Sequence, residues 1–243
     1  MLISVMYHHV KSDRCSNDLA MFELHMRYVS ENFTSCFPTM EKLEKNPICL
    51  VFDDGYFDFY KYIYPILRKY DLKALLAVVP RYVLDDTDVD DATRLGFEHN
   101  ELFEQYENAT FCTYKELQEM SDSGLVQIAS HSYSHKNLIA SDVDLRNELL
   151  KSKEILENKL GVEVESFVYP FGKYDQNVLN ETMKSYKYSF RIGNGVNKDF
   201  RGVNGVVYRI DGDFLESPSD IFSFANMLKF RAKTFIKTIV GNR

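Results

Sequence analysis

The chain has no tryptophan and few cysteines among its 243 residues. Its four cysteines are Cys15, Cys36, Cys49 and Cys112. No two of them form a Cys-x-x-Cys pair, which disfavours a thiolate zinc site, and they are too sparse for a disulfide framework. We therefore expect free thiols in a protein that works in a reducing compartment.

Long apolar runs and an excess of basic residues are also missing. No apolar run reaches the roughly 18 residues that a transmembrane helix requires. The N-terminus shows no basic stretch followed by a cleavage pattern, so we expect a cytoplasmic protein. The 29 basic residues are outnumbered by 36 acidic ones, which gives a net charge of −7. This balance argues against a nucleic-acid-binding protein.

Apolar residues are plentiful, and they occur in short runs. Hydrophobic residues make up 45% of the chain and aromatic residues 14%, which is ample for a large core. No internal repeat or low-complexity linker interrupts the sequence. Short apolar runs predict strands over residues 2–6, 48–52, 74–79, 126–130, 166–169, 188–192 and 206–210.

Amphipathic segments lie between these runs and predict helices over residues 22–32, 56–70, 113–123 and 142–160. Thr113 and Glu116 have the spacing of a capping box, and Gly161 would end the last of these helices. Strands that alternate with helices indicate an α/β fold with a parallel sheet or barrel.

Two segments do not fit this alternation. Residues 81–111 form a long acidic insertion, which we expect to lie over the site as a lid or a surface excursion. In residues 216–243, an amphipathic helix is predicted by apolar residues at helical spacing and by basic residues on its other faces. The apolar residues are Ile221, Ala225, Leu228, Ala232, Phe235 and Ile239, and the basic ones are Lys229, Arg231, Lys233 and Lys237. Such a helix either packs on the barrel or makes a peripheral contact with an anionic membrane.

Acidic and imidazole side chains follow two of the predicted strands. Asp53 and Asp54 come after the strand at 48–52, and Gly55 permits a sharp turn there. His131 and His135 follow the strand at 126–130, and a helical turn between them would aim both rings at one point. Active sites of parallel barrels lie at the carboxyl ends of the strands. Two imidazoles and one carboxylate make a zinc-type site with open positions.

These residues resemble the motifs of the polysaccharide deacetylases, the carbohydrate esterase family 4 or NodB-homology group. The first motif corresponds to Val51-Phe52-Asp53-Asp54-Gly55 and the second to His131-Ser132-Tyr133-Ser134-His135. A third corresponds to Tyr169-Pro170-Phe171-Gly172, a segment that alone would be read as an ordinary turn. The resemblance implies a distorted (β/α) barrel of about seven parallel strands, with a catalytic domain over residues 1–215.

The resemblance also implies roles for single residues. Asp54, His131 and His135 would bind one divalent metal ion, with zinc favoured and cobalt or nickel as alternatives. Asp53 would be the general base, and the Phe171 N–H would donate to the oxyanion. Tyr169, Pro170 and Phe171 would form a wall of the substrate groove. The implied activity is removal of an N-acetyl group from an amino sugar of a glycan or glycan precursor.

The sequence departs from the family pattern at three points. Val168 stands where many members have an arginine that braces the catalytic aspartate. The tryptophan of a fourth motif is absent, and no histidine follows His135 to act as the late general acid. Arg209 is a candidate replacement for the brace, with a surface ion pair as the alternative.

His8 is a candidate replacement for the general acid. Met6-Tyr7-His8-His9-Val10 resembles the branch that deacetylates poly-N-acetylglucosamine, in which an early histidine protonates the leaving amine. A purely structural His8 is the alternative.

Two other functions stay open at the level of sequence. A glycan-binding module could keep the fold and lose the chemistry, which the missing arginine and tryptophan favour. The same chemistry could also act on a formamide or on an amide that is not part of a sugar. The sequence identifies neither the sugar and its chain length nor the oligomeric state.

Overall fold

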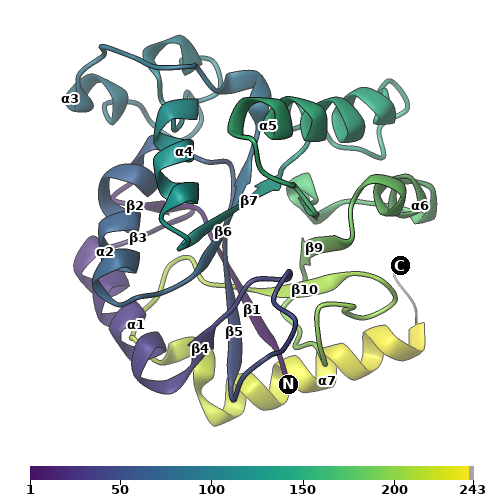
Figure 1. The fold of residues 1–243 in the computed structure, drawn as a ribbon. Coiled ribbons are helices and arrows are strands. Elements are labelled where there is room, and N and C mark those ends of the chain that lie inside the picture. Colours follow the sequence, from purple (N-terminus) through teal and green to yellow (C-terminus); the bar gives the residue numbers. More distant parts are fainter. Residues whose placement is uncertain (241–243) are drawn as a thin grey trace.

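Seven parallel strands close into a barrel in the computed structural model, which describes residues 1–240 (Figure 1). Their order is β1-β10-β9-β8-β7-β6-β5, and β1 pairs with β5 to close the ring. The strands of the ring are β1 (Ile3–Tyr7), β5 (Pro47–Phe52), β6 (Ala74–Val78), β7 (Val126–Ser130), β8 (Ser166–Val168), β9 (Tyr188–Ile192) and β10 (Val207–Asp211). The predicted barrel of about seven strands is confirmed, and a short β4 (Thr34–Ser35) lies against β5.

Strands β5 and β6 are apolar on both faces because each face has its own core. Val51, Leu75 and Ala77 belong to one buried cluster inside the barrel. The alternate residues Leu50 and Leu76 belong to another, which also contains apolar side chains of the surrounding helices. Successive side chains of a strand point to opposite faces, so a strand between two cores reads as a continuous apolar run.

Helices surround the barrel, and α1 and α4 begin within three residues of the predicted positions. They are α1 (Leu19–Asn32), α2 (Tyr64–Lys69), α3 (Asp91–Arg94), α4 (Tyr114–Asp122), α5 (Ser152–Leu160), α6 (Gln176–Ser185) and α7 (Phe224–Val240). The Thr113–Glu116 capping box that starts α4 is present in both directions. A π-helical turn over Phe59–Ile63 precedes α2, and another over Asn147–Lys151 precedes α5.

Two helix predictions need correction. The helix expected from residue 142 starts at residue 145, because the Asp144 carboxylate caps its N-terminus by accepting hydrogen bonds from the backbone N–H groups of Arg146 (3.0 Å) and Asn147 (3.3 Å). Helix α6 was not predicted at all. Its N-terminus is capped by Asp175, which accepts from the Val178 N–H at 2.8 Å and is a signal that the sequence does carry.

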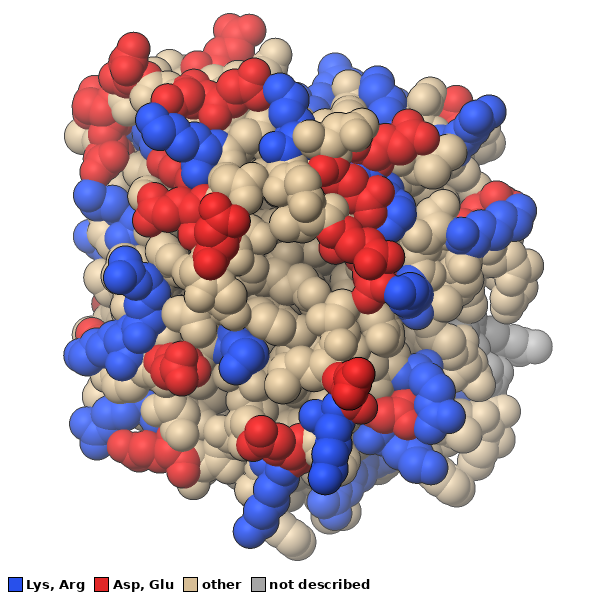
Figure 2. Space-filling view, viewed as in Figure 1, with Lys and Arg blue, Asp and Glu red and all other residues tan. Residues whose placement is uncertain are grey.

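The acidic insertion over residues 81–111 is tied to the barrel by Arg94. This buried guanidinium lies 3.3 Å from the Phe57 ring centroid and donates to the Ala109 carbonyl at 2.8 Å. It also forms a two-pronged ion pair with Glu116, at 2.7 and 2.8 Å. Figure 2 shows acidic side chains gathered over the upper left of the molecule, where Figure 1 places the insertion. The insertion is therefore a structured part of the barrel surface.

Helix α7 runs along the lower edge of the barrel in Figure 1. It contacts the body through Phe230, which is buried, and through Thr234, whose hydroxyl accepts from the Val196 N–H at 2.8 Å. Most of the predicted apolar stripe does not make this contact, because Leu228, Phe235 and Ile239 are exposed. Ile221 is buried, but it lies before the start of α7. Within residues 1–240, no helix combines the length and the apolar character needed to cross a membrane. The last three residues of the predicted 216–243 segment lie outside the described residues.

Candidate active site

Asp53 and Asp54 stand at the carboxyl end of β5, where the chain leaves the barrel. The Asp53 N–H donates to the Tyr7 carbonyl at 2.9 Å, so the pairing of β5 with β1 extends to this residue. Asp54 has a φ of 70° and Gly55 a φ of 78°, which turns the chain sharply. Both carboxylates are buried. The turn sends the two side chains to different partners.

Asp54, His131 and His135 form a compact group of possible metal ligands. Oδ1 of Asp54 lies 3.6 Å from Nε2 of His131 and 3.3 Å from Nε2 of His135. One ligand atom from each residue lies within 4.8 Å of the others. The three residues come from the ends of β5 and β7, as expected for the carboxyl-end face of a parallel barrel.

The donor set of this group fits a divalent metal ion. Oδ1 of Asp54 is buried and has no hydrogen-bond partner within the described part of the chain, although a buried polar atom left unpaired is costly. Burial raises the pKa of Asp54, but electrostatic interactions with His135 and His131 lower it to about 2. Burial lowers the pKa of His135 to about 4. An ionised carboxylate and a neutral imidazole are the forms that bind metals.

A tight loop positions the two histidines. Nδ1 of His131 contacts the Val168 carbonyl at 2.8 Å, so it carries the proton and leaves the Nε2 lone pair facing Asp54. The His135 N–H donates to the Ser132 hydroxyl at 2.9 Å. Ser132 and His135 have φ values of 64° and 56°. The predicted helical turn between the histidines is therefore wrong, because left-handed residues bend this loop.

Glu148 holds the same loop in place through two hydrogen bonds. Its carboxylate accepts from the Ser134 N–H at 2.9 Å and from the Ser134 hydroxyl at 2.5 Å. Glu148 is buried and lies in the π-helical turn before α5. Glu148 was not predicted, since nothing in the neighbouring sequence marks it as a partner of a loop 14 residues earlier. Such turns are frequent at functional sites.

Arg209 braces Asp53 through two parallel hydrogen bonds. Nη1 lies 2.5 Å from Oδ1 of Asp53, and Nη2 lies 2.9 Å from Oδ2. Burial raises the pKa of Asp53, but the charge and hydrogen bonds of Arg209, together with the effects of His131 and His8, outweigh burial and lower the pKa. Arg209 lies near the end of β10 and is only 1% exposed. The alternative of a surface ion pair is therefore wrong.

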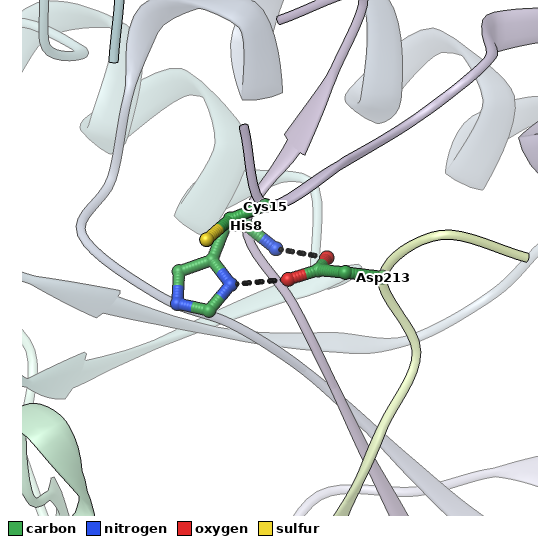
Figure 3. A group of neighbouring side chains, drawn as sticks. All are labelled: His8, Cys15 and Asp213. Carbon is green, nitrogen blue, oxygen red and sulfur yellow. Dashed lines mark hydrogen bonds and ion pairs between the residues drawn. The ribbon is translucent and has the colours of Figure 1, made fainter. Parts of the chain in front are cut away.

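His8 lies between Asp213 and Asp53, as Figure 3 shows for the Asp213 side. Asp213 Oδ2 is 2.6 Å from Nδ1 of His8, and Asp213 Oδ1 accepts from the His8 N–H at 3.1 Å. Nε2 of His8 is 3.9 Å from Oδ2 of Asp53. Burial lowers the pKa of His8, but the hydrogen bond and charge of Asp213 raise it to about 9. His8 is therefore protonated at neutral pH, with Nε2–H facing the base.

Asp213 was not predicted, although it follows the last barrel strand. The pairing of Met6 with Asp211 brings the end of β1 beside the end of β10. A side chain on Gly212 would lie 2.4 Å from the Tyr7 ring and 2.8 Å from the Met6 carbonyl, so only glycine fits there. This close approach sets Asp213 against His8. The Asp-Gly-Asp pattern after a strand was the available signal.

The third motif forms one wall of a cavity. Phe171 has a φ of 58°, is exposed, and its ring centroid lies 4.7 Å from that of His135. The cavity of about 360 Å³ is lined by Tyr169 and Phe171 but not by Pro170, which is buried behind them. The same cavity contains the other predicted site residues. These are His8, Asp53, Asp54, His131, His135 and Arg209.

The acidic insertion supplies the opposite side of this cavity. Phe103 stacks on His135, with centroids 5.0 Å apart, and His99 also lines the space. Nδ1 of His99 is 3.1 Å from Nε2 of His9, whose other ring nitrogen is 3.2 Å from Asp58. The insertion was expected to lie over the site, but the sequence did not show that His99 and Phe103 are the residues that reach the cavity.

The sequence matches the family described as polysaccharide deacetylase over residues 40–190, which is more than half of the chain. The chain belongs to this family, which includes the carbohydrate esterase family 4 and NodB-homology proteins. The poly-β-1,6-N-acetyl-D-glucosamine N-deacetylase of Escherichia coli is 27% identical over 183 residues, covering 63% of this chain and 26% of that protein. A Bacillus subtilis relative is 26% identical over 195 residues, covering 74% of this chain and 60% of its own length. The chain thus spans between a quarter and three fifths of these relatives.

Solved structures share the fold over nearly the whole chain. A Streptococcus pyogenes deacetylase in complex with acetate is 24% identical and has a TM-score of 0.70, covering 94% of this chain and 96% of its own. A de-N-acetylase from Aggregatibacter actinomycetemcomitans is 20% identical and has a TM-score of 0.71, covering 94% of this chain and 99% of its own. At these identities the likeness shows the fold alone, so the chemistry has to be argued from the site.

Proposed function

We propose that this chain is a metal-dependent hydrolase that removes the N-acetyl group from an amino sugar of a glycan or glycan precursor. The observation that carries the proposal is the pairing of two neighbouring carboxylates with different partners. Asp54 faces two imidazoles, and Asp53 is held by Arg209. A protein that only bound glycans would have no need of a braced, ionised base beside a metal site.

Asp54, His131 and His135 would hold one divalent ion, with zinc preferred and cobalt or nickel acceptable. When bound, such an ion lowers the pKa of water from about 15.7 to near 7 and polarises the amide carbonyl. The coordination positions not used by the three side chains are left for water and substrate. The donor set supports an ion of this class and does not select among its members.

The other groups of the site transfer protons or hold the reacting groups in place. Asp53 accepts a proton from the attacking water, and Arg209 keeps that carboxylate ionised and oriented. The backbone N–H of Phe171 donates to the oxyanion as the carbonyl becomes tetrahedral. His8 then gives its Nε2 proton to the nitrogen as the C–N bond breaks. The products are acetate and a free amine. Asp213 holds the His8 ring in its orientation through the hydrogen bond to Nδ1.

The substrate enters a cavity that is walled by aromatic rings. The rings of Phe171 and Phe103 both contact His135, and Tyr169 also lines the cavity. Sugar rings present apolar faces that such rings can pack against. Every side chain given a role lies between residues 8 and 213, which supports a catalytic unit over residues 1–215. The resemblance to poly-N-acetylglucosamine deacetylases favours a β-linked N-acetylglucosamine substrate.

Acid release from a panel of N-acylated compounds tests the proposal. The panel holds N-acetylglucosamine oligomers, N-formylated sugars and simple acetamides, each with added zinc, cobalt or nickel. We expect acetate from the N-acetylated sugars. Formate release, or equal turnover of a simple acetamide, would support a deacylase of another amide. Stoichiometric metal with no turnover of any compound would support the glycan-binding module.

A further inference from the structure

A second group of ligand-type side chains lies beside the metal group described above. His8, Cys15 and Asp213 each offer one ligand atom, and these atoms lie within 4.8 Å of one another (Figure 3). The three residues come from separate parts of the chain. His8 follows β1, Cys15 precedes the short strand β3 (Ser16–Asn17), and Asp213 follows β10. His8 and Cys15 also line the cavity of the candidate active site.

The chemistry of this group differs from that of Asp54, His131 and His135. It adds a thiolate to an imidazole and a carboxylate, and thiolates favour zinc and other soft ions. We propose that His8, Cys15 and Asp213 form a second, inhibitory cation site, which removes the proposed acid from catalysis when it is filled. The proposal that a cation binds here is based on this geometry alone, whereas the proposal that it inhibits rests on the proposed function.

The second site should bind more weakly than the first. Asp213 already holds His8 through two hydrogen bonds, one of them 2.6 Å long, and a metal ion has to displace the shorter one. It must also displace protons from His8 and Cys15. By contrast, Oδ1 of Asp54 has no hydrogen bond to lose among the described residues. Metal should therefore activate at one equivalent and inhibit in excess.

Cobalt titration of the full chain tests the site without relying on activity. A thiolate bound to cobalt gives a charge-transfer absorption in the near ultraviolet, and only the second site contains a thiol. We expect this band to appear with the second equivalent and to be absent from Cys15→Ser. Cys36→Ser, which changes a buried thiol outside the cavity lining, should keep it.

Activity supplies the second readout. Excess zinc should inhibit the parent but not Cys15→Ser, each compared with its own activity at one equivalent of zinc. A parent protein that never shows the thiolate band would overturn the site. A band without any hydrolytic activity would leave the site in place and contradict the proposed function instead. Equal inhibition of the parent and Cys15→Ser by excess zinc would overturn the inhibitory role.

A separate observation concerns the outer face of α7. Phe224 is 86% exposed, Phe235 and Ile239 are each 67% exposed, and Leu228 is 59% exposed. The helix is held to the body by its other face, where Lys237 donates to the Gly193 carbonyl at 2.8 Å. Side chains of this size, lined up on one face of a helix, mark an interaction surface.

The charges of α7 indicate what covers this surface. The helix has four basic residues, Lys229, Arg231, Lys233 and Lys237, and no acidic residue, in a chain whose net charge is −7. Lys229 and Arg231 are exposed beside the apolar stripe. An apolar stripe flanked by cations suits the interface of a bilayer with anionic headgroups. We infer that α7 lies flat on an anionic membrane surface.

Vesicle sedimentation of the full chain tests this inference. We expect the protein to pellet with vesicles of phosphatidylcholine and phosphatidylglycerol, but not with phosphatidylcholine alone. Leu228→Ser/Phe235→Ser and Lys229→Glu/Arg231→Glu should each reduce pelleting at least several-fold. Met183→Ser/Lys184→Glu makes matched changes on the exposed face of α6 and should have no effect.

Two results would contradict the membrane inference. One is the absence of pelleting together with a dimer, seen by light scattering, that Leu228→Ser/Phe235→Ser converts to a monomer. This outcome would assign the stripe to a second copy of the chain. The other is pelleting that the two α7 variants do not change.

Discussion

Asp53 and Asp54 are adjacent in the chain, yet their surroundings differ completely. The left-handed turn at Asp54 sends its carboxylate toward His131 and His135, while Asp53 meets Arg209. A guanidinium that donates two hydrogen bonds fixes the plane of a carboxylate as well as its charge. The arginine comes from β10, the strand on the far side of β1 from β5. The brace that the family often places before the third motif is thus supplied from another strand.

The brace leads to a prediction for Arg209. Arg209→Met would leave Asp53 buried without its partner, so unfolding in denaturant should show a loss of about 3–5 kcal/mol. kcat/KM for N-acetylglucosamine oligomers should fall strongly in the same variant. Arg209→Lys keeps the positive charge but loses the two parallel hydrogen bonds, so its kcat/KM should lie between those of the parent and Arg209→Met. Parent-like kcat/KM in Arg209→Met would show that Asp53 needs no brace.

Asp213 sets the pH range in which His8 can act as an acid. The folded-state pKa of His8 is raised to about 9, so the protonated form persists through neutral pH and is lost as the pH rises through that value. Asp213→Asn removes the negative charge and should move the alkaline limb of kcat/KM to lower pH. Asp199→Asn, on a surface ion pair with Arg201, is the control. An alkaline limb that stays in place would remove His8 from the mechanism.

At the scale of elements, the loop of residues 131–135 depends on the π-helical turn that carries Glu148. Glu148→Gln weakens both contacts to Ser134, so the two imidazoles should lose their orientation toward Asp54. We expect metal affinity to drop by about 10- to 100-fold, the usual range for partners behind metal ligands. Competition with a chelator measures it, with the exposed Glu154→Gln as control. Unchanged affinity would show that the loop holds its shape unaided.

The elements also show what sequence patterns can and cannot supply. The strands over Val126–Ser130 and Tyr188–Ile192 were predicted residue for residue, because apolar residues at every second position are typical of a strand. The stripe on α7 has the right periodicity, but periodicity does not say which face meets the barrel. Phe230, Thr234 and Lys237 make that contact instead.

In the candidate site, too, some residues are marked by local sequence patterns and others are not. Local motifs identified Asp53, Asp54, His131 and His135, because each pair sits within a few residues of a strand end. The partners that were missed, Asp213, Glu148 and Phe103, act across 205, 14 and 32 residues of chain. The Asp-Gly-Asp pattern places Asp213 after a strand, but which residue each of the three contacts depends on the closing of the barrel and the folding of the insertion, and no local pattern encodes those.

At the scale of the whole molecule, the metal group joins segments that are distant in the chain, so binding should stabilise the fold. Free zinc at about 100 times its Kd should raise the free energy of unfolding by about 2.7 kcal/mol. The rise should be seen as a higher Tm in the parent and in His99→Gln, and it should vanish in His135→Ala. An equal rise in His135→Ala would place the stabilising ion elsewhere.

The central claim is that Asp53 and Asp54 divide base and ligand roles between them. Bound metal and turnover, measured together on Asp53→Asn, test it most directly. We predict one equivalent of metal at the Asp54 group and a loss of turnover of about 100-fold or more, the usual contribution of a positioned base. Loss of the metal would make Asp53 a ligand, and parent-like turnover with metal bound would mean that Asp53 is not the base.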